Sequence, residues 1–255
     1  MKAAFVTGAA GDIGRATVRA LVAQGWKIAA ADLNEKRLGL FAAECGEAVV
    51  PVMCDITRAD SVRSAVAAAN EKLGAITLLV NNAGGISAPS LRTVTEAQWV
   101  GDIELNLTGH WRCINAVQEQ MISRGRGVIV NVASVNGLGI FGHPGYSAAK
   151  AGLIHLTKFA AVELGRFGIR AVAICPGSVR TQAWIERAAQ KPEILDEITR
   201  WYPSRAVCEP GDVAAVILHA ASDESRMLNG AVIALDGGLS SGTDRVASLF
   251  TGQEI

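Results

Sequence analysis

The sequence predicts an α/β protein, a single doubly wound domain in which a seven-stranded parallel sheet carries helices on both faces. Two observations predict this class. Short apolar runs alternate with longer runs of helical periodicity, which is typical of strand–helix–strand units joined by right-handed crossovers. Half of the residues are hydrophobic but only 5% are aromatic, so Ala, Val, Ile and Leu build the core, as in buried parallel sheets. We therefore expect residues 1–255 to form one domain.

The order of elements follows from these runs. Seven short runs are the candidate strands: 3–7, 27–31, 48–54, 78–81, 127–133, 170–175 and 231–235. Helical spacing follows the first strand, where Gly25 is placed to end the helix. Further helices are expected at 59–72, 96–124, 145–166 and 212–222.

Residues 180–207 interrupt the alternation with Trp184, Trp201 and Tyr202 among mixed charges. They predict a helical insertion, either a substrate lid or a surface hairpin packed by its aromatic side chains. Residues 239–255 form a C-terminal tail that either packs on a partner subunit or frays.

Charge and cysteine content argue against several classes of protein. The formal net charge is zero, so no basic excess marks a nucleic-acid partner. Five scattered cysteines without a Cys-x-x-Cys pair argue against disulfides and zinc, and for a reducing compartment. The N-terminal apolar run is too short for a signal-peptide core or a membrane span. We expect a cytoplasmic protein that acts on a small molecule, with no nucleic-acid, membrane or metal partner.

The first strand leads into Thr7-Gly-Ala-Ala-Gly-Asp-Ile-Gly14 and then a helix. Small residues let the backbone approach a pyrophosphate, which the helix N-terminus attracts, so the sequence predicts a Rossmann-type dinucleotide turn; the alternative is an ordinary tight turn between strand and helix. Asp32 ends the second strand, where a carboxylate accepts hydrogen bonds from the adenosine ribose and repels a 2′-phosphate; the alternative is that it caps a loop. No Lys or Arg immediately follows it, so NAD is favoured over NADP. Asp55 and Ile56 end the third strand and are expected at the adenine.

Tyr146 and Lys150 lie one helical turn apart, on one face of a helix. A neighbouring ammonium favours phenolate, so we expect Lys150 to lower the pKa of Tyr146 and enable proton exchange. Ser134 follows a strand at its carboxyl end, where ligands bind in parallel sheets. Asn106 lies within a helical pattern in which an amide is not favoured.

Together these motifs resemble the short-chain dehydrogenase/reductase family, in its Tyr-x-x-x-Lys branch of about 250 residues, from Thr7 to Gly238. The resemblance implies that Tyr146 is the acid/base, that Lys150 binds the nicotinamide ribose, and that Ser134 orients the substrate oxygen. It implies that Asn106 holds a relay water, and that the protein is a homotetramer or, less often, a dimer. The expected cofactor-binding residues are Gly8, Gly11, Asp12, Ile13, Gly14, Asp32, Leu33, Asp55, Ile56, Asn82, Ala83, Gly84, Tyr146, Lys150, Pro176, Gly177, Val179 and Thr181.

Two features depart from the family pattern. Asp12 occupies the place of the middle glycine, where its charge is unfavourable beside a pyrophosphate unless it points away. Ser134 precedes Tyr146 by 12 residues, about one fewer than is common in the family.

The expected substrate residues are mostly apolar or aromatic, which suits a hydrophobic or aryl secondary alcohol and its ketone. They are Ser134, Asn136, Ile140, Phe141, His143, Ser178 and Trp184, with Ile86, Ser87, Leu138, Trp201 and Tyr202 as further candidates. His143 either touches substrate or supports the loop before Pro144.

Three functions are compatible with the sequence. The first is an NAD-dependent alcohol dehydrogenase or ketone reductase. The second is a 3-oxoacyl thioester reductase, against which Asp32 argues because those enzymes usually use NADPH; Phe167 also stands where they often carry Arg. The third is a non-catalytic dinucleotide sensor, which has no need of an acid–base pair.

Overall fold

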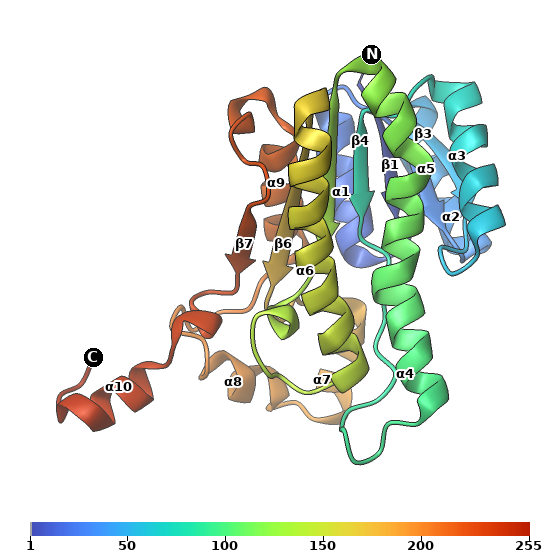
Figure 1. Cartoon of the computed structure of the whole chain (residues 1–255). Helices are drawn as coiled ribbons and strands as arrows, with labels where there is room; N and C mark the ends of the chain where they lie inside the picture. Colours follow the sequence, from blue (N-terminus) through green and yellow to red (C-terminus); the bar gives the residue numbers. More distant parts are fainter. Residues whose placement is uncertain (1) are drawn as a thin grey trace.

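The computed structural model describes residues 2–255; Met1, part of the predicted domain, lies outside the described residues. Seven parallel strands form one sheet in the order β3-β2-β1-β4-β5-β6-β7 (Figure 1). Their bounds are β1 Ala3–Thr7, β2 Lys27–Asp32, β3 Val49–Met53, β4 Leu78–Asn81, β5 Gly127–Val132, β6 Ile169–Pro176 and β7 Val232–Leu235. The predicted doubly wound fold is confirmed, and each predicted strand agrees with an observed one to within one residue at either end.

Helices cover both faces of the sheet (Figure 1). They are α1 Asp12–Ala23, α2 Glu35–Cys45, α3 Ala59–Leu73, α4 Glu96–Ile103, α5 Gly109–Arg124, α6 Pro144–Leu164, α7 Gln182–Gln190, α8 Ile194–Thr199, α9 Pro210–Ala221 and α10 Asp244–Thr251. Side chains of α1, α2 and α9 share one core with Ala4 and Val6 of β1. Those of α3, α5 and α6 share the other with Ala3 and Phe5. Because successive residues of a strand face opposite sides, one apolar strand serves both cores.

Two helical segments differ from the sequence prediction. The single helix expected at 96–124 is divided, because a π-helical turn at Glu104–Thr108 separates α4 from α5. Helix α2 was not predicted, since it buries only Leu38, Phe41 and Ala42 and so gives a weak apolar pattern.

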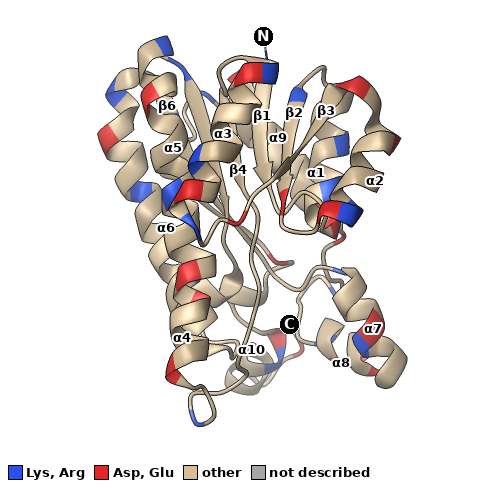
Figure 2. Cartoon of the chain, turned by 90° about the vertical axis from the view of Figure 1, so that its right-hand side faces the viewer, with Lys and Arg blue, Asp and Glu red and all other residues tan. Residues whose placement is uncertain are grey.

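The insertion (residues 180–207) contains α7 and α8, which lie beyond the carboxyl ends of the strands (Figure 1). The C-terminal tail contains α10, which projects away from the sheet (Figure 1). Acidic and basic residues are interspersed along the outer helices (Figure 2). Within residues 2–255, no helix is both long and apolar enough to cross a bilayer.

Candidate active site

Three neighbouring cavities lie along the carboxyl ends of the strands. The turn cavity, about 440 Å³, adjoins the loop between β1 and α1. The tyrosine cavity, about 240 Å³, is lined by Ser134, Tyr146 and Lys150. The outer cavity, about 730 Å³, extends under α7 and α8. Asn82 lines both the turn and tyrosine cavities, and Tyr146 lines both the tyrosine and outer cavities, so the three form one continuous cleft.

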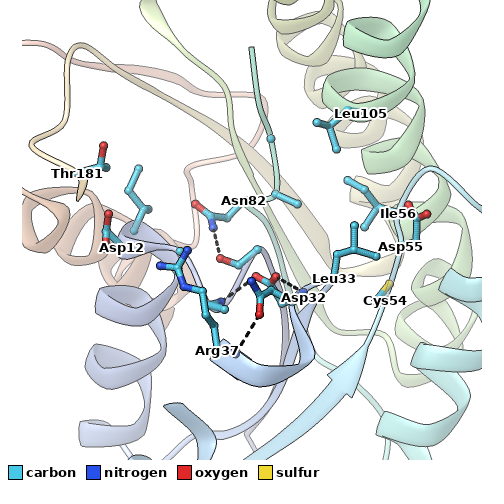
Figure 3. Close-up of a pocket in the computed structure, with 18 residues that line it drawn as sticks. Asp12, Asp32, Leu33, Arg37, Cys54, Asp55, Ile56, Asn82, Leu105 and Thr181 are labelled. Atoms are coloured by element: carbon cyan, nitrogen blue, oxygen red, sulfur yellow. Dashed lines mark hydrogen bonds between the residues drawn. The ribbon is translucent and has the colours of Figure 1, made fainter. Parts of the chain in front are cut away.

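The structure distributes the expected cofactor-binding residues over two of these cavities. The turn cavity is lined by Gly8, Gly11, Asp12, Ile13, Gly14, Asp32, Leu33, Asp55, Ile56, Asn82, Ala83, Gly84 and Thr181, several of which Figure 3 labels. The tyrosine cavity is lined by Tyr146, Lys150, Pro176, Gly177 and Val179. Residues that the sequence analysis did not name also line the turn cavity: Ala10, Asn34, Arg37, Cys54 and Leu105.

The glycine turn is shaped to hold an anion against the start of α1. Gly8 has a φ of 64°, a conformation that glycine adopts without steric cost. A Cβ atom on Gly14 would lie 2.1 Å from the carbonyl oxygen of Gly8, so only glycine lets α1 pack this close. The N-cap residue, Gly11, supplies no side-chain hydrogen bond, which leaves first-turn N–H groups for an anionic ligand such as a pyrophosphate.

Asp32 stabilises the glycine turn by a hydrogen bond and also lines the turn cavity. Its Oδ2 accepts a hydrogen bond from the Ala10 N–H at 2.9 Å, and its Oδ1 accepts one from the Asn34 N–H at 2.9 Å (Figure 3). Each carboxylate oxygen keeps a further acceptor site, which suits ribose hydroxyls. Arg37 lines the same cavity because the first turn of α2 brings it back beside Asp32.

Asp12 points toward the insertion. Its Oδ2 accepts a hydrogen bond of 2.7 Å from the backbone N–H of Gln182, the first residue of α7. The N-cap residue of α7, Thr181, supplies no side-chain hydrogen bond of its own, so the carboxylate caps this helix from 170 positions away in the sequence. The charge that departs from the family pattern is thus directed away from the expected pyrophosphate position.

Ser134, Tyr146 and Lys150 converge on the tyrosine cavity despite the short spacing between the first two. Ser134 follows the end of β5 in extended conformation, and Tyr146 and Lys150 lie in the first two turns of α6. The Lys150 Nζ donates a hydrogen bond of 2.8 Å to the carbonyl oxygen of Val132 and lies 5.5 Å from the centroid of the Tyr146 ring. Serine hydroxyl, phenol and ammonium therefore face one small space.

The pKa expected for Tyr146 from the sequence is wrong in direction. Burial raises the pKa of Tyr146, and the hydrogen bond with Ser134 only partly offsets this effect. Burial also lowers the pKa of Lys150, from 10.5 to about 7, because it disfavours the charged ammonium. Burial thus favours the protonated phenol, the form that can donate a proton.

Asn106 lies in the π-helical turn and supports the loop that faces Lys150. Its Nδ2 donates to the carbonyl oxygens of Gly85 (2.9 Å) and Asp102 (3.0 Å), and its Oδ1 accepts from the Gly85 N–H at 3.2 Å. A Cβ on Gly84 would lie 2.9 Å from Asn106 Oδ1 and 3.7 Å from Lys150 Nζ. The backbone at Gly84 therefore lies between the side chains of Asn106 and Lys150. The π-helical turn that carries Asn106 is a type of turn that occurs frequently at functional sites.

A buried polar chain beneath the site was not predicted. Asn81 Nδ2 donates to Asn131 Oδ1, and Asn131 Nδ2 donates to Thr157 Oγ1, each at 2.8 Å, so that β4, β5 and α6 are joined. The sequence contained a sign of this chain, because Asn81 ends one apolar strand run and Asn131 interrupts another. A buried amide at such a position requires a hydrogen-bond partner.

His110 is buried in the same region, and its Nε2 lies 2.7 Å from the carbonyl oxygen of Ala83. Burial and the charge of Lys150 lower the pKa of His110 to about 3. The ring is thus neutral and its Nε2–H donates, which makes His110 a support for the loop after β4.

Most of the expected substrate residues line the outer cavity, but Ile140 does not. Ser134, Asn136, Phe141, His143, Ser178 and Trp184 line it, as do Ile86, Trp201 and Tyr202. Ile140 is 91% exposed and, with Leu138, lines an adjoining apolar groove that shares Asn136 and His143 with the outer cavity, so its side chain does not line the outer cavity as expected. Glycines on both sides of the Ile140–Phe141 pair let the loop turn Ile140 outward while Phe141 lines the cavity.

Two further substrate candidates, Ser87 and His143, form hydrogen bonds with loop or helix backbone, and only His143 also lines the outer cavity. Ser87 does not line the outer cavity; its hydroxyl donates to the carbonyl oxygen of Gln98. The Nδ1 of His143 lies 3.0 Å from the carbonyl oxygen of Ala88, so this residue both supports a loop and lines the cavity.

The fold and this cleft are those of a nucleotide-dependent oxidoreductase: a glycine turn at a helix N-terminus, a carboxylate at the end of β2 and a serine–tyrosine pair line one cleft. The comparisons with known proteins agree. The family model described as enoyl-(acyl carrier protein) reductase matches residues 8–240. The chain belongs to the short-chain dehydrogenase/reductase family, whose members bind a nicotinamide dinucleotide.

Three similar proteins illustrate the range of this family. A short-chain dehydrogenase/reductase from Burkholderia thailandensis is 40% identical, with a TM-score of 0.93 over 99% of this chain and 98% of its own. The hydroxy(phenyl)methylsuccinyl-CoA dehydrogenase subunit BbsD of Thauera aromatica is 34% identical, over 94% of this chain and 96% of its own. The structure of an actinorhodin polyketide ketoreductase with NADPH is 30% identical, with a TM-score of 0.90 over 94% of this chain and 98% of its own.

Proposed function

We propose that this protein is an NAD-dependent alcohol dehydrogenase or ketone reductase that acts on a hydrophobic or aryl secondary alcohol and its ketone. One observation carries the proposal: Ser134 and Tyr146 line both the tyrosine cavity and the outer cavity, whose walls include Phe141, Trp184 and Trp201. An apolar, aromatic wall around two hydroxyl groups suits a ketone with a hydrophobic substituent.

The chain's own residues supply orientation and the proton. The Ser134 hydroxyl accepts a hydrogen bond from the Asn136 N–H at 3.2 Å, which fixes the oxygen at the cavity wall. Ser134 and Tyr146 hold the carbonyl oxygen of the substrate, and the phenol of Tyr146 donates its proton to that oxygen. The nicotinamide dinucleotide, when bound, supplies or removes the hydride. Lys150 binds the nicotinamide ribose, and Asn106 positions the relay water.

The preference for NAD rests on Asp32. Its carboxylate lines the turn cavity and is held by two backbone N–H groups, so it cannot easily move away from a 2′-phosphate. Arg37 is the one feature that favours NADP, since its guanidinium side chain lines the same cavity. We assign the preference to NAD because the fixed carboxylate lies at the end of a strand, whereas Arg37 is exposed on α2.

The alternative is a 3-oxoacyl thioester reductase. The names of two similar proteins favour it, since one acts on a CoA thioester and the other is a polyketide ketoreductase bound to NADPH. The hydroxy(phenyl)methyl group in the name of the first is itself an aryl secondary alcohol, which agrees with the first proposal.

A screen for NADH oxidation with aliphatic, alicyclic and aryl ketones, run in parallel with NADPH and with acetoacetyl-CoA, tests the proposal. We expect the highest kcat/KM for an aryl or hydrophobic ketone with NADH. Faster reduction of acetoacetyl-CoA than of every simple ketone would assign the thioester function. A protein that binds NADH and reduces none of these substrates is a dinucleotide sensor, and the proposal fails.

Two further expectations accompany this function. We propose a homotetramer, as is common in the family, with the projecting α10 (Figure 1) available for contact with a partner; sedimentation measures the assembly. We also propose a cytoplasmic location, since the five cysteines of the described chain are free thiols, as a reducing compartment requires.

A further inference from the structure

The outer cavity contains one charged group that the proposed reaction does not use. Arg187, on α7, lines this cavity, and none of the other residues that line it is a Lys, Arg, Asp or Glu. Arg187 does not line the turn cavity or the tyrosine cavity. The phosphates of a dinucleotide in those two cavities therefore do not explain its position.

Arg187 also differs from each of the other cations of the insertion. Arg180, Lys191 and Arg205 are each paired with a carboxylate, and Arg200, which has no such pair, does not line the outer cavity. Within residues 2–255, no ion pair or side-chain hydrogen bond joins Arg187 to another residue. Acidic residues occur on both helices of the insertion, Glu186 on α7 and Asp196 and Glu197 on α8, yet none of them pairs with Arg187.

The guanidinium of Arg187, an exposed residue, lies over an aromatic ring rather than beside a carboxylate. It lies 5.0 Å from the ring centroid of Trp184, three positions earlier on the same face of α7. A guanidinium that stacks on an indole keeps the N–H groups at its edge free, and these groups match a carboxylate bidentately. Trp184 also lines the cavity, so a planar aromatic wall and a pre-oriented cation face the same space.

From this arrangement we propose that the substrate is an oxo acid or hydroxy acid: it carries a carboxylate remote from the reacting carbonyl, and Arg187 binds that carboxylate. The inference rests on the proposed ketone reduction and specifies its substrate class. The carbonyl lies between Ser134 and Tyr146, the hydrophobic body of the substrate contacts the aromatic wall, and the anionic end meets α7. An anion could also come from the phosphates of a thioester carrier, and the experiment separates these two sources.

The test compares each oxo acid with its own methyl ester, so that only the charge changes. Suitable pairs are 4-acetylbenzoate and methyl ketones with a terminal carboxylate at increasing chain lengths. We expect the wild-type protein to prefer the acid at one or more lengths, and Arg187→Gln to lower its acid-to-ester ratio of kcat/KM by about 10- to 100-fold. Arg187→Lys should restore part of the ratio, since it keeps the charge without the planar fork. Lys191→Gln is the control, because Lys191 is a cation of the same insertion that does not line the cavity.

A second measurement does not depend on turnover. Calorimetric titration of the NADH-loaded protein with 4-ethylbenzoate, which has no ketone, should give binding that Arg187→Gln weakens and Lys191→Gln leaves unchanged. Esters reduced as well as acids at every length, or an acid-to-ester ratio that Arg187→Gln does not change, would overturn the inference while the ketone reductase function stands. If Arg187→Gln impairs only the reduction of acetoacetyl-CoA, then Arg187 binds the phosphates of a thioester carrier, and the oxo-acid inference is overturned. If neither acids nor esters are reduced, the proposed function itself fails.

Discussion

The hydrogen bond between Asp12 and Gln182 predicts that the cofactor turn and α7 are coupled. The bond is 2.7 Å long and joins a carboxylate to the N-terminus of a helix. A hydrogen bond to a charged group contributes about 1.5–3 kcal/mol, and a carboxylate at a helix N-terminus about 0.3–1 kcal/mol. Because Asp12 is only half-buried, we take about 1–2 kcal/mol for the whole contact, which changes the ratio of docked to undocked α7 by about 5- to 30-fold.

The measurement is amide hydrogen exchange in α7, where Trp184 and Ile185 donate to the carbonyl oxygen of Thr181. Asp12→Ala should raise exchange of these amides by about 5- to 30-fold, and Asp12→Asn, which keeps an acceptor oxygen, should raise it less. The KM for substrate should rise by a smaller factor than the amide exchange rate, because α7 stays docked in most molecules of the variant. Glu35→Ala removes a first-turn carboxylate of α2, away from the insertion, and serves as the control. Equal exchange in α7 of wild type and Asp12→Ala would refute the coupling.

Three further predictions concern the cofactor turn and Lys150. Asp32→Asn should raise the NADPH-to-NADH ratio of kcat/KM by about tenfold, since it removes the charge that repels a 2′-phosphate; an unchanged ratio contradicts the role of Asp32. Gly14→Ala would place a Cβ 2.1 Å from a backbone oxygen, so thermal unfolding should show a loss of about 1–3 kcal/mol together with weaker NADH binding. Gly39→Ala, which meets open space in α2, should not destabilise the protein. The pKa of Lys150 falls from 10.5 to about 7 on folding, so between these values the unfolded chain binds more protons and stability rises with pH. The free energy of unfolding in urea, measured at each end of that pH window, should rise less for Lys150→Met than for the wild type. Equal rises would show that folding does not lower the pKa of Lys150.

The sheet could be predicted from the sequence because its strands are buried on both faces and leave continuous apolar runs. The convergence of Ser134, Tyr146 and Lys150 on one cavity could be predicted because Ser134 follows a strand and the other two lie in the first turns of a helix at the same edge of the sheet. The π-helical turn at Asn106 was not predictable, since one extra residue in a turn barely changes the apolar spacing of a long helix.

Features that depend on distant contacts were missed. The orientation of Asp12 depends on α7, which is far away in the sequence. Arg37 reaches the turn cavity only because α2 folds back over Asp32. Ile140 has the apolar character expected of a substrate contact, but the backbone of its loop turns it outward. For the pKa of Tyr146, burial raises the value more than the hydrogen bond with Ser134 lowers it.

The central claim is that the phenol of Tyr146 donates the proton to a carbonyl held beside Ser134. The most direct test measures kcat of Tyr146→Phe on the best ketone, together with the Kd of the variant for NADH. We predict that kcat falls by about 100- to 10,000-fold while the Kd for NADH is unchanged, because the ring is kept and only the hydroxyl is lost. Wild-type turnover by Tyr146→Phe would contradict the account.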